Sequence, residues 1–453
     1  MYGENTMLKL MKYLRVPLPE DIAKLKLSGD FDRALKLIDD RLHNPAVPQV
    51  MKNRLLAEKE IISRLPSEYP YSQNEGLELI QKEIPDFSEK ELEYYMDRGD
   101  ADWFMVNGQR HLQDSFFDSM KKVYPEIAAR AGQAPASSEL LDENIRAMKA
   151  DGSAAWHVRL RHTLRIKDSS FEKGKVLVHL PVPASCMNMK EIRILRTDPC
   201  ECYIAPEDSE SRTVSFAADL SENRDFMVEY EYLSEVKYTD PDPADAVLGS
   251  YEINDEEPEL VRTELIRQLC EELRGEETNP LAIARRFYDF VTKNVIYSFM
   301  RQYITLGHIG EYCASRLRGD CGVQALLFIE LCRCAGIPAQ WQSGKYVTPD
   351  YVGNHDWAMF YVQPWGWLFA DCSFGGSAWR AGALERHDYY FGNLDPFRMA
   401  ANNGLLREFD PPKKHWRIDP YDNQNGEAEY EDRGLGSDEL ICRCEVLEMH
   451  KVR

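Results

Sequence analysis

Hydrophobic residues recur at helical spacing along the first 150 residues of the chain. Between Phe31 and Leu42, for example, apolar side chains follow one another at steps of three and four and share one helix face. Further helices are predicted over residues 69–84, 88–96 and 115–131. Ser88 followed by Glu91 forms the pattern of a capping box. Because no cluster of catalytic residue types accompanies these helices, residues 1–150 are expected to form a helical domain that packs on the rest of the chain or restricts access to it.

The period changes from helical to alternating after residue 153. Between Trp156 and Ile166 every second residue is apolar or histidine, which is typical of a strand with one buried face. Further short strands are predicted over residues 176–180, 192–195, 213–216 and 226–233. Residues 154–236 are therefore expected to form an antiparallel, β-sandwich-like module. Its histidines His157, His162 and His179 are interpreted as structural residues, because their spacing matches no metal motif.

From residue 260 to residue 410, helical and strand-like segments alternate. One helix, which runs from Cys321 to about Ala335, is hydrophobic nearly all round and is therefore expected to be buried. Gly336 and Pro338 favour its end at this point. Other helices are predicted over residues 260–273 and 280–294, and strands over residues 339–344, 356–362 and 367–371.

Cys321 lies in the first turn of this buried helix. A helix start carries unpaired N–H groups and a partial positive charge, which favour the thiolate, the reactive form of cysteine. A lone buried cysteine is more often an inert packing residue. The neighbours of Cys321 therefore decide between the two interpretations.

A histidine and an aspartate flank the last two predicted strands. His355 lies at the start of one strand and Asp371 at the end of the next, with a tight turn between the strands. In an antiparallel hairpin these two positions come to the same end of the sheet. We predict that the helix start abuts that end, so that Cys321, His355 and Asp371 form a triad of nucleophile, base and orienting acid.

Three blocks of sequence resemble the transglutaminase-like superfamily, whose core is similar to that of papain-like cysteine proteases. They are Gly319-Asp320-Cys321-Gly322 with the helix end Ala335-Gly336-Ile337-Pro338-Ala339, then His355-Asp356-Trp357, then the residues from Trp367 to Ser373. The resemblance spans residues 259–374. It implies an α+β fold with a papain/transglutaminase-like core, in which the nucleophile helix packs on an antiparallel sheet. Asp356 departs from the pattern, because many members carry a small residue at this position.

The reaction that these residues support is acyl transfer through a thioester. Cys321 would attack a peptide or amide carbonyl, His355 would protonate the leaving amine, and the backbone N–H of Cys321 would stabilise the oxyanion. Hydrolysis of the thioester gives a peptidase or amidase, the preferred interpretation. Capture by an amine gives a protein-glutamine transglutaminase. A glycopeptide amidase and a non-catalytic protein-binding module are also compatible with these residues, and no cofactor or metal is expected.

Four further residues are predicted to bind substrate: Gln302, Tyr303, Trp357 and Arg398. Gln302 or Tyr303 would replace the tryptophan that some animal transglutaminases use near the oxyanion. Arg398 belongs to an aromatic region that follows Asp371 directly, and this region could instead anchor the tail. Residues 260–410 are thus expected to form the catalytic core, and residues 411–453 a C-terminal extension.

Composition and charge limit the number of domains, the possible partners and the cellular location. With 453 residues the chain exceeds the size of one hydrophobic core, so two or three domains are expected. The net charge of −21 disfavours nucleic acid and anionic membrane as partners, but it does not identify a substrate. The expected peptide or protein substrate is what the resemblance implies. Eleven scattered cysteines and an N-terminus without a signal-peptide pattern favour a cytoplasmic location with reduced thiols. No apolar run approaches the length of a membrane span.

A polar linker is predicted over residues 239–259. Its acidic run from Asp255 to Glu259 lacks the alternating ligands and central glycine of a calcium-binding EF-hand loop. The run is therefore interpreted as a solvated linker and not as a calcium site.

Overall fold

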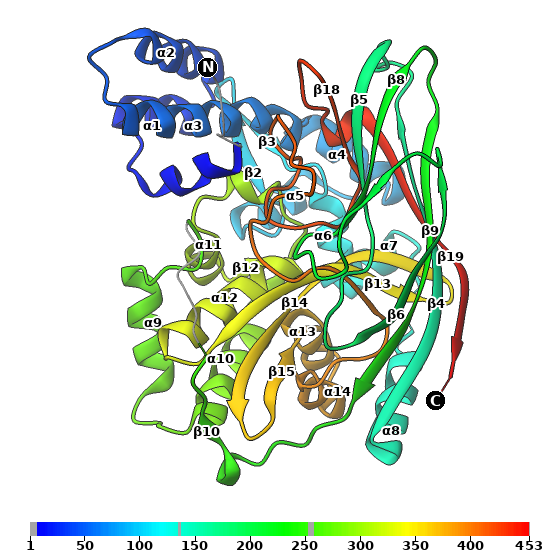
Figure 1. Cartoon of the computed structure of the whole chain (residues 1–453). Helices are drawn as coiled ribbons and strands as arrows, with labels where there is room; N and C mark the ends of the chain where they lie inside the picture. The colour runs from blue at the N-terminus through cyan, green and yellow to red at the C-terminus, as the bar shows by residue number, and fades with distance from the viewer. Residues whose placement is uncertain (1–6, 135–136, 252–257, 453) are drawn as a thin grey trace.

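The computed structural model describes residues 7–134, 137–251 and 258–452. Within these ranges the fold is mixed α+β, with N-terminal helices, several antiparallel sheets and a core of helices around a further sheet (Figure 1). Most of the acidic run predicted as a solvated linker, residues 255–257, lies outside the described residues. Glu259, the last residue of the run, is described, and there the prediction is wrong. Its carboxylate is fully buried because it accepts hydrogen bonds from Ile309 N and from the Tyr421 hydroxyl. Among the described helices, none combines the length and the hydrophobicity of a bilayer-spanning segment.

The N-terminal region is helical, as the spacing of its apolar residues predicts. The predicted capping box is confirmed: the Ser88 hydroxyl accepts from Glu91 N, and the Glu91 carboxylate accepts from Ser88 N. The helix predicted over residues 115–131 is instead two helices, because Pro125 has no N–H to continue the first and begins the second. The helices are α1 (Glu20–Leu27), α2 (Phe31–His43), α3 (Gln49–Glu68), α4 (Gln73–Glu83), α5 (Glu89–Asp97), α6 (Phe116–Val123), α7 (Pro125–Arg130) and α8 (Glu139–Asp151), after a 3₁₀ helix, η1 (Met7–Arg15). The short strands β1 (Tyr71–Ser72), β2 (Trp103–Val106) and β3 (Gln109–Leu112) form a small sheet beside them.

Two four-stranded antiparallel sheets follow and share one hydrophobic cluster. Their strands are β4 (Ser153–Ile166), β5 (Gly174–Pro181), β6 (Met189–Asp198), β7 (Tyr203–Ile204), β8 (Thr213–Leu220) and β9 (Asp225–Lys237), completed by β18 (Glu427–Tyr430) and β19 (Leu440–Lys451). The strand orders are β19-β4-β9-β6 and β18-β5-β8-β7. Along most of β4, buried side chains alternate with partly exposed ones, as the alternating pattern of the sequence predicts.

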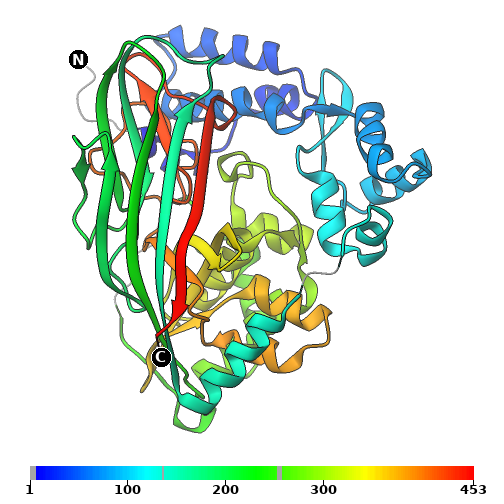
Figure 2. The ribbon, with the colours of Figure 1, turned by 90° about the vertical axis from the view of Figure 1, so that its right-hand side faces the viewer.

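The C-terminal segment supplies an edge strand to each of these sheets. Leu440 pairs with Ile166, and the pairing of β19 with β4 continues to Lys451, so the two long strands run side by side (Figure 2). Glu427 to Tyr430 pair in the same way with β5. Residues 411–453, which the sequence analysis treats as a C-terminal extension, thus complete sheets that begin more than 250 residues earlier along the chain.

The core is built on a third antiparallel sheet, in the order β16-β15-β14-β13-β17, with β10 paired to β14. Its strands are β10 (Val247–Leu248), β13 (Ala339–Thr348), β14 (Tyr351–Gln363), β15 (Gly366–Ala370), β16 (Phe391–Gly392) and β17 (Arg398–Asn402). The helices around it are α9 (Glu264–Arg274), α10 (Pro280–Asn294), α11 (Ile309–Arg316), α12 (Cys321–Cys334), α13 (Cys372–Arg380) and α14 (Leu384–Tyr389). Two short strands, β11 (Ile296–Tyr297) and β12 (Arg318–Gly319), pair in parallel before α12.

One strand boundary differs from the prediction and affects the site. The sequence places His355 at the start of a strand, but β14 begins at Tyr351, so His355 lies within it. The reason is that β13 extends to Thr348 and keeps pairing with the residues before His355. His355 therefore has a fixed strand geometry, with its side chain on one defined face of the sheet.

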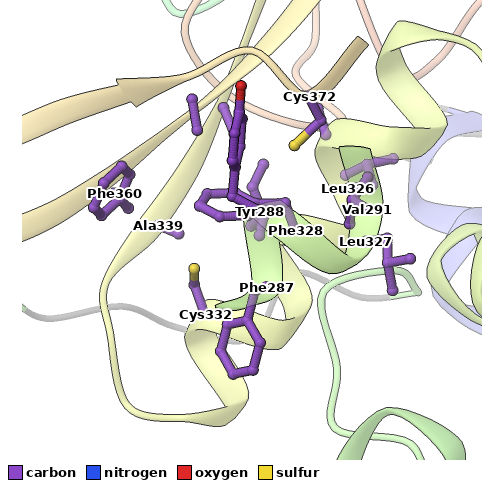
Figure 3. Close-up of a cluster of buried hydrophobic side chains, with 14 of the residues drawn as sticks. Phe287, Tyr288, Val291, Leu326, Leu327, Phe328, Cys332, Ala339, Phe360 and Cys372 are labelled. Carbon is purple, nitrogen blue, oxygen red and sulfur yellow. The ribbon is translucent and has the colours of Figure 1, made fainter. Parts of the chain in front are cut away.

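The helix α12 is buried along nearly its whole length, as its hydrophobic sequence predicts. Phe328 meets Phe360 of β14 edge-on, with 5.7 Å between ring centres, within the cluster drawn in Figure 3. Each fully buried leucine or phenylalanine of this kind contributes about 1.5–3 kcal/mol to folding. Because α12 is packed against α10 and β14, its first residue, Cys321, is held in a fixed place.

Candidate active site

The segment before Cys321 is fixed by hydrogen bonds. Asp320 is the N-cap of α12, and its carboxylate accepts a hydrogen bond from Val323 N at 3.1 Å. The same oxygen accepts from the Tyr303 hydroxyl at 2.6 Å. Cys321 follows as the first helical residue and is 8% exposed. The sequence thus holds a thiol at a capped helix start, next to the backbone N–H groups of the first turn.

A cavity of about 1270 Å³ lies beside Cys321. Its wall is formed by side chains of α3, of the loop between β11 and α11, of β14, and of residues 415–438. Acidic side chains outnumber basic ones on this wall. The volume exceeds the range of about 300–1,000 Å³ that is usual for small-molecule pockets, so the cavity has room for a peptide segment.

The Cys321 thiol donates a hydrogen bond to the Asp356 carboxylate, with Sγ 3.2 Å from Oδ2. The other carboxylate oxygen of Asp356 accepts from Gln424 Nε2 at 2.5 Å. Burial, and then the charges of Asp356 and Asp320, raise the pKa of the Cys321 thiol well above its usual range. These effects outweigh the helix start, so the thiol is protonated near neutral pH. The Asp356 carboxylate is the group within reach of its proton.

The carboxyl groups around Cys321 resist ionisation. Burial raises the pKa of Asp320 to about 6, although hydrogen bonds from Tyr303 and Val323 oppose the shift. Burial, followed by the charge of Asp320, raises the pKa of Asp356 well above its usual range. Burial thus raises the pKa of two carboxyl groups and of a thiol at the same site.

His355 belongs to a different cluster. Its Nε2 atom is 2.7 Å from Asp371 Oδ2, and Arg398 Nη1 is 2.8 Å from the same oxygen. All three side chains are buried, and Phe374 lies 4.7 Å from the His355 ring and 4.4 Å from the Arg398 guanidinium. Burial opposes ionisation of Asp371, but the charges of His355 and Arg398 outweigh it and hold the pKa of Asp371 far below its usual range. Burial lowers the pKa of His355, against the effect of Asp371.

The alternation of β14 separates the two clusters. His355 and Asp356 are consecutive strand residues, so their side chains point to opposite faces of the sheet. Asp356 faces α12, whereas His355 stacks on Trp357, with 6.1 Å between ring centres. The hairpin thus brings His355 to Asp371, as its spacing predicts. Among the described residues, no hydrogen bond joins Cys321 to His355, so the three predicted triad residues are not all in contact.

The family comparison covers this part of the chain. Residues 267–372 match the transglutaminase-like superfamily. This segment is a transglutaminase-like domain. It contains Cys321, His355 and Asp371, as well as α12 and the hairpin of β14 and β15.

Solved structures with likeness to the chain are distant. A proposed cysteine protease from Cytophaga hutchinsonii is 14% identical with a TM-score of 0.37, and the match covers 66% of this chain and 89% of that one. The periplasmic domain of TgpA from Pseudomonas aeruginosa is 13% identical with a TM-score of 0.24, over 54% of this chain and 96% of that one. A proposed protease from Parabacteroides distasonis is 11% identical with a TM-score of 0.19, over 49% and 60%. No curated protein matches the sequence. The chemistry of the site therefore rests on its own residues.

The predicted substrate-binding residues divide into two pairs. Gln302 and Tyr303 line the cavity beside Cys321. The Gln302 side chain accepts from Arg64 at 2.6 Å, and Tyr303 donates to the helix cap Asp320. Trp357 and Arg398 are fully buried on the other face of β14, where Trp357 Nε1 donates to Gln342. Arg398 pairs with Asp371 and Asp395, and neither of these two residues is among those that line the cavity.

Sequence reasoning missed the polar partners of the transglutaminase-like cysteine. Asp356 carries a signal, because it stands where many members of the superfamily have a small residue. Gln424 and Asp422 carry no such signal, since they lie in a polar segment about 100 residues after Cys321, without strand or helix periodicity. Only the fold brings this segment to the cavity.

Two groups of metal-ligand residue types occur among the described residues, both away from the cavity: Glu259, His308 and Glu330, and the largely exposed His157, Glu448 and His450. In the first group, His308 Nδ1 accepts a hydrogen bond from Glu311 N at 3.2 Å. The proton of the neutral ring then lies on Nε2, the nitrogen nearer to Glu330. Nε2 lies 3.9 Å from Glu330 Oε1 and forms no hydrogen bond with the described residues, and we assign no metal to the group.

Proposed function

We propose that this protein catalyses acyl transfer on peptide or amide substrates with Cys321 as the nucleophile, and that hydrolysis is its main outcome. The observation that carries the proposal is the Cys321 thiol at the start of a buried helix, beside a peptide-sized cavity and hydrogen-bonded to Asp356. The transglutaminase-like domain around Cys321 supports the same reaction class. All eleven cysteines are free thiols, which suits the reducing cytoplasm that the sequence predicts.

In the first step, Cys321 Sγ attacks the substrate carbonyl while its proton passes to Asp356 Oδ2. A carboxylate with a raised pKa is a suitable base for this transfer, because its proton affinity approaches that of the group it must deprotonate. The backbone N–H of Cys321 and the start of α12 lie next to the developing oxyanion and stabilise it. Asp356 then gives the proton to the leaving amine, and the acyl group stays on sulfur as a thioester.

In the second step, water attacks the thioester and Asp356 takes a proton from it. The tetrahedral intermediate collapses, the C–S bond breaks, and the proton returns to the Cys321 sulfur. Release of the carboxylic acid restores the enzyme. A primary amine in place of water would give the transglutaminase outcome with the same residues.

His355 and Asp371 keep the roles of base and orienting acid as the alternative within this proposal. They act directly only if the His355 ring reaches Cys321 Sγ when substrate binds, since the hydrogen bond of the thiol is to Asp356. If they do not, the pair acts as a positioning group, because it fixes the strand residue that precedes Asp356.

The test is turnover of a peptide library, followed by mass spectrometry, with a labelled amine present in parallel. Cys321→Ala should abolish all products, and Asp356→Asn should lower kcat by about 10²–10⁴-fold. His355→Gln should have a smaller effect if Asp356 is the base. Products that persist in Cys321→Ala would overturn the proposal, and label incorporation that exceeds hydrolysis would favour the transglutaminase.

A non-catalytic binding module is the second candidate. It is favoured by the protonated Cys321 thiol and by the separation of His355 from it. A module of this kind would bind peptide in the cavity with the same affinity in the wild type and in Cys321→Ala, and the wild type would form no thioester. Trapping of an acyl intermediate on Cys321 by rapid acid quench, read by mass spectrometry, would exclude it.

A further inference from the structure

Asp422 is a buried aspartate on the cavity wall. The residue is 5% exposed, and it lines the cavity that holds Cys321. Its hydrogen bond with another residue runs through the backbone, where Arg417 donates to the Asp422 carbonyl oxygen. Among the described residues, none forms a hydrogen bond or an ion pair with its carboxylate. A buried charge without a partner is costly, so this carboxylate is placed to gain from a cation in the cavity.

The charges of other carboxylates that line the cavity affect Asp422. Burial, and then the charges of Asp419 and Asp356, raise the pKa of Asp422 well above its usual range. Asp356 in turn responds to the charges of Asp320 and Asp419. Each of these residues lines the cavity. The carboxylates thus repel one another across a shared space, and a positive charge placed there would relieve all of them.

The basic side chains near Asp422 are engaged by other groups. Arg417 donates to Glu427 Oε1 and to the carbonyl oxygen of Arg407. Lys345 donates to the side chains of Asn354 and Asn425. None of these hydrogen bonds involves the carboxylate of Asp422 or Asp419. The charge of Arg417 lowers the pKa of Asp422, but burial and the neighbouring carboxylates outweigh it, so the wall would still gain from a cationic ligand.

Arg64, which also lines the cavity, is engaged in the same way. Its guanidinium donates to Gln302, to the carbonyl oxygens of Arg417 and Ile418, and to Glu60. It therefore holds the loop of residues 417–418 in place and leaves the carboxylates of the following turn to face the cavity.

The spacing of the carboxylates suits an organic cation. Three ligand atoms within 4.8 Å of one another occur among the described residues only at the two groups named above, and neither includes Asp356, Asp419 or Asp422. A bare metal ion therefore does not reach three of these carboxylates together. An alkylammonium group carries several N–H donors and spreads its contacts, and the rings of Tyr297, Tyr303 and Trp416 on the same wall offer cation–π contacts.

We propose that the cavity binds a primary ammonium group of the substrate, as in a lysine side chain, against Asp422 and Asp419 while Cys321 attacks a neighbouring carbonyl. This inference rests on the proposed acyl transfer at Cys321, and it names the substrate class: peptides with a basic residue next to the reacting bond. Peptides with an acidic residue at that place are rejected by the same carboxylates.

The subsite is tested first by binding, without turnover. In Cys321→Ala protein, N-acetyl-lysine methylamide and N-acetyl-norleucine methylamide are compared by calorimetry at low and high salt. The lysine compound should bind at least about tenfold more tightly at low salt, and Asp422→Asn should remove most of that preference. Asp438→Asn, an exposed change on the rim of the same cavity, is the matched control and should keep it.

Equal affinity for the two compounds, or an unchanged preference in Asp422→Asn, would overturn the inference. Displacement of the lysine compound by calcium ions at constant ionic strength would also overturn it, because the site would then bind a metal ion. If Asp422→Asn does not fold, as judged by its melting curve, Asp419→Asn replaces it with the same expected loss.

Kinetics then separate the subsite from the proposed function. In the wild type, kcat/KM for a lysine peptide should exceed that for its norleucine analogue about tenfold, and Asp422→Asn should reduce the ratio mainly through KM. If lysine binds but neither peptide is turned over, the proposed function fails and the subsite stands. If both are turned over equally well, the function stands and the subsite fails.

Discussion

On the two faces of strand β14, a buried aspartate has different partners, and its pKa is shifted in opposite directions. On one face, Asp371 meets both His355 and Arg398, and its pKa falls far below the usual range. On the other, Asp356 meets a thiol and an amide, and its pKa rises. The first face is closed and compensated, which suits a structural cluster. The second lines a cavity, and no cation of the described residues pairs with Asp356 there, which suits chemistry and ligand binding.

The residue types of a triad do not by themselves form a triad. His355 and Asp371 have the contact expected of a base and its orienting acid, and yet the thiol is bonded to the next residue of the strand. A one-residue step along a strand exchanges the face to which a side chain points. The group that accepts the proton of Cys321 therefore depends on which face of β14 lies against α12. Substitutions on each face of β14 can test which residue it is.

The largest effect is expected from Arg398→Met on the closed face. It leaves Asp371 and Asp395 buried with one positive partner fewer, and should lower the free energy of unfolding by about 3–5 kcal/mol. Urea denaturation measures the change. Arg193→Met is the matched control, because Arg193 itself is largely exposed and its pair with Glu231 is worth less than about 1 kcal/mol. Equal losses in the two variants would contradict the difference between closed and exposed pairs.

Gly322→Ala should perturb the open face. A Cβ atom at this position would lie 2.2 Å from the Tyr303 hydroxyl and 2.9 Å from Asp356 Oδ2. The overpacking is expected to cost about 1–3 kcal/mol and to displace Asp356 from Cys321. Thermal unfolding measures the cost. In a Tyr303→Phe background the same change should cost less, since the nearest clashing atom is gone, and an unchanged cost would show that the hydroxyl is not the obstacle.

Asp356→Asn should make Cys321 more reactive towards iodoacetamide. Removal of a neighbouring negative charge lowers the pKa of the thiol, so the alkylation rate near pH 7.5 is expected to rise about tenfold. Mass spectrometry of the peptide that contains Cys321 separates this thiol from the other ten. His355→Gln is the control from the closed face and should leave the rate unchanged. A slower reaction in His355→Gln would place the imidazole next to the thiol.

The last prediction concerns how the free energy of unfolding depends on pH. The pKa of Asp320 is raised to about 6, so its contribution to stability is present below the unfolded value near 4 and is lost as the pH rises through 6. Asp320→Asn keeps the cap, and its stability relative to the wild type should rise as the pH rises from 4 to 7. The pKa of Glu427, between Lys413 and Arg417, is lowered to about 2, so its contribution is lost as the pH falls from above 4.5 towards 2. Glu427→Gln should therefore show the opposite trend in chemical denaturation across pH.

Local patterns predict a good part of the fold. The capping box at Ser88, the alternation of β4 and the buried helix from Cys321 each depend on neighbouring residues, and each is found in the structure. The hairpin that brings His355 to Asp371 is also local, because a tight turn joins its two strands. In these cases the spacing of residues close together in the sequence is enough to predict the local structure.

The remainder depends on contacts between distant segments. Periodicity shows that His355 and Asp356 face opposite ways, but it does not show which face α12 covers. Arg398 reads as a loop residue in the sequence, although it is the buried partner of Asp371. Gln424 reaches Asp356 only because β18 and β19 return the chain to the first sheets. None of these pairings has a signature in a short window.

Because β18 and β19 pair with strands from early in the chain, the parts of the cavity form in a defined order. During synthesis, α12 and the hairpin of β14 and β15 emerge well before residues 415–438, which form much of the cavity wall. Until those residues arrive, β4 and β5 lack their edge partners and the thiol of Cys321 lacks Gln424 behind its carboxylate neighbour. Contacts across so long a stretch of chain form late in folding. A nascent chain therefore carries its cysteine in an unfinished pocket, and a competent site arises only when the last strands close the sheets.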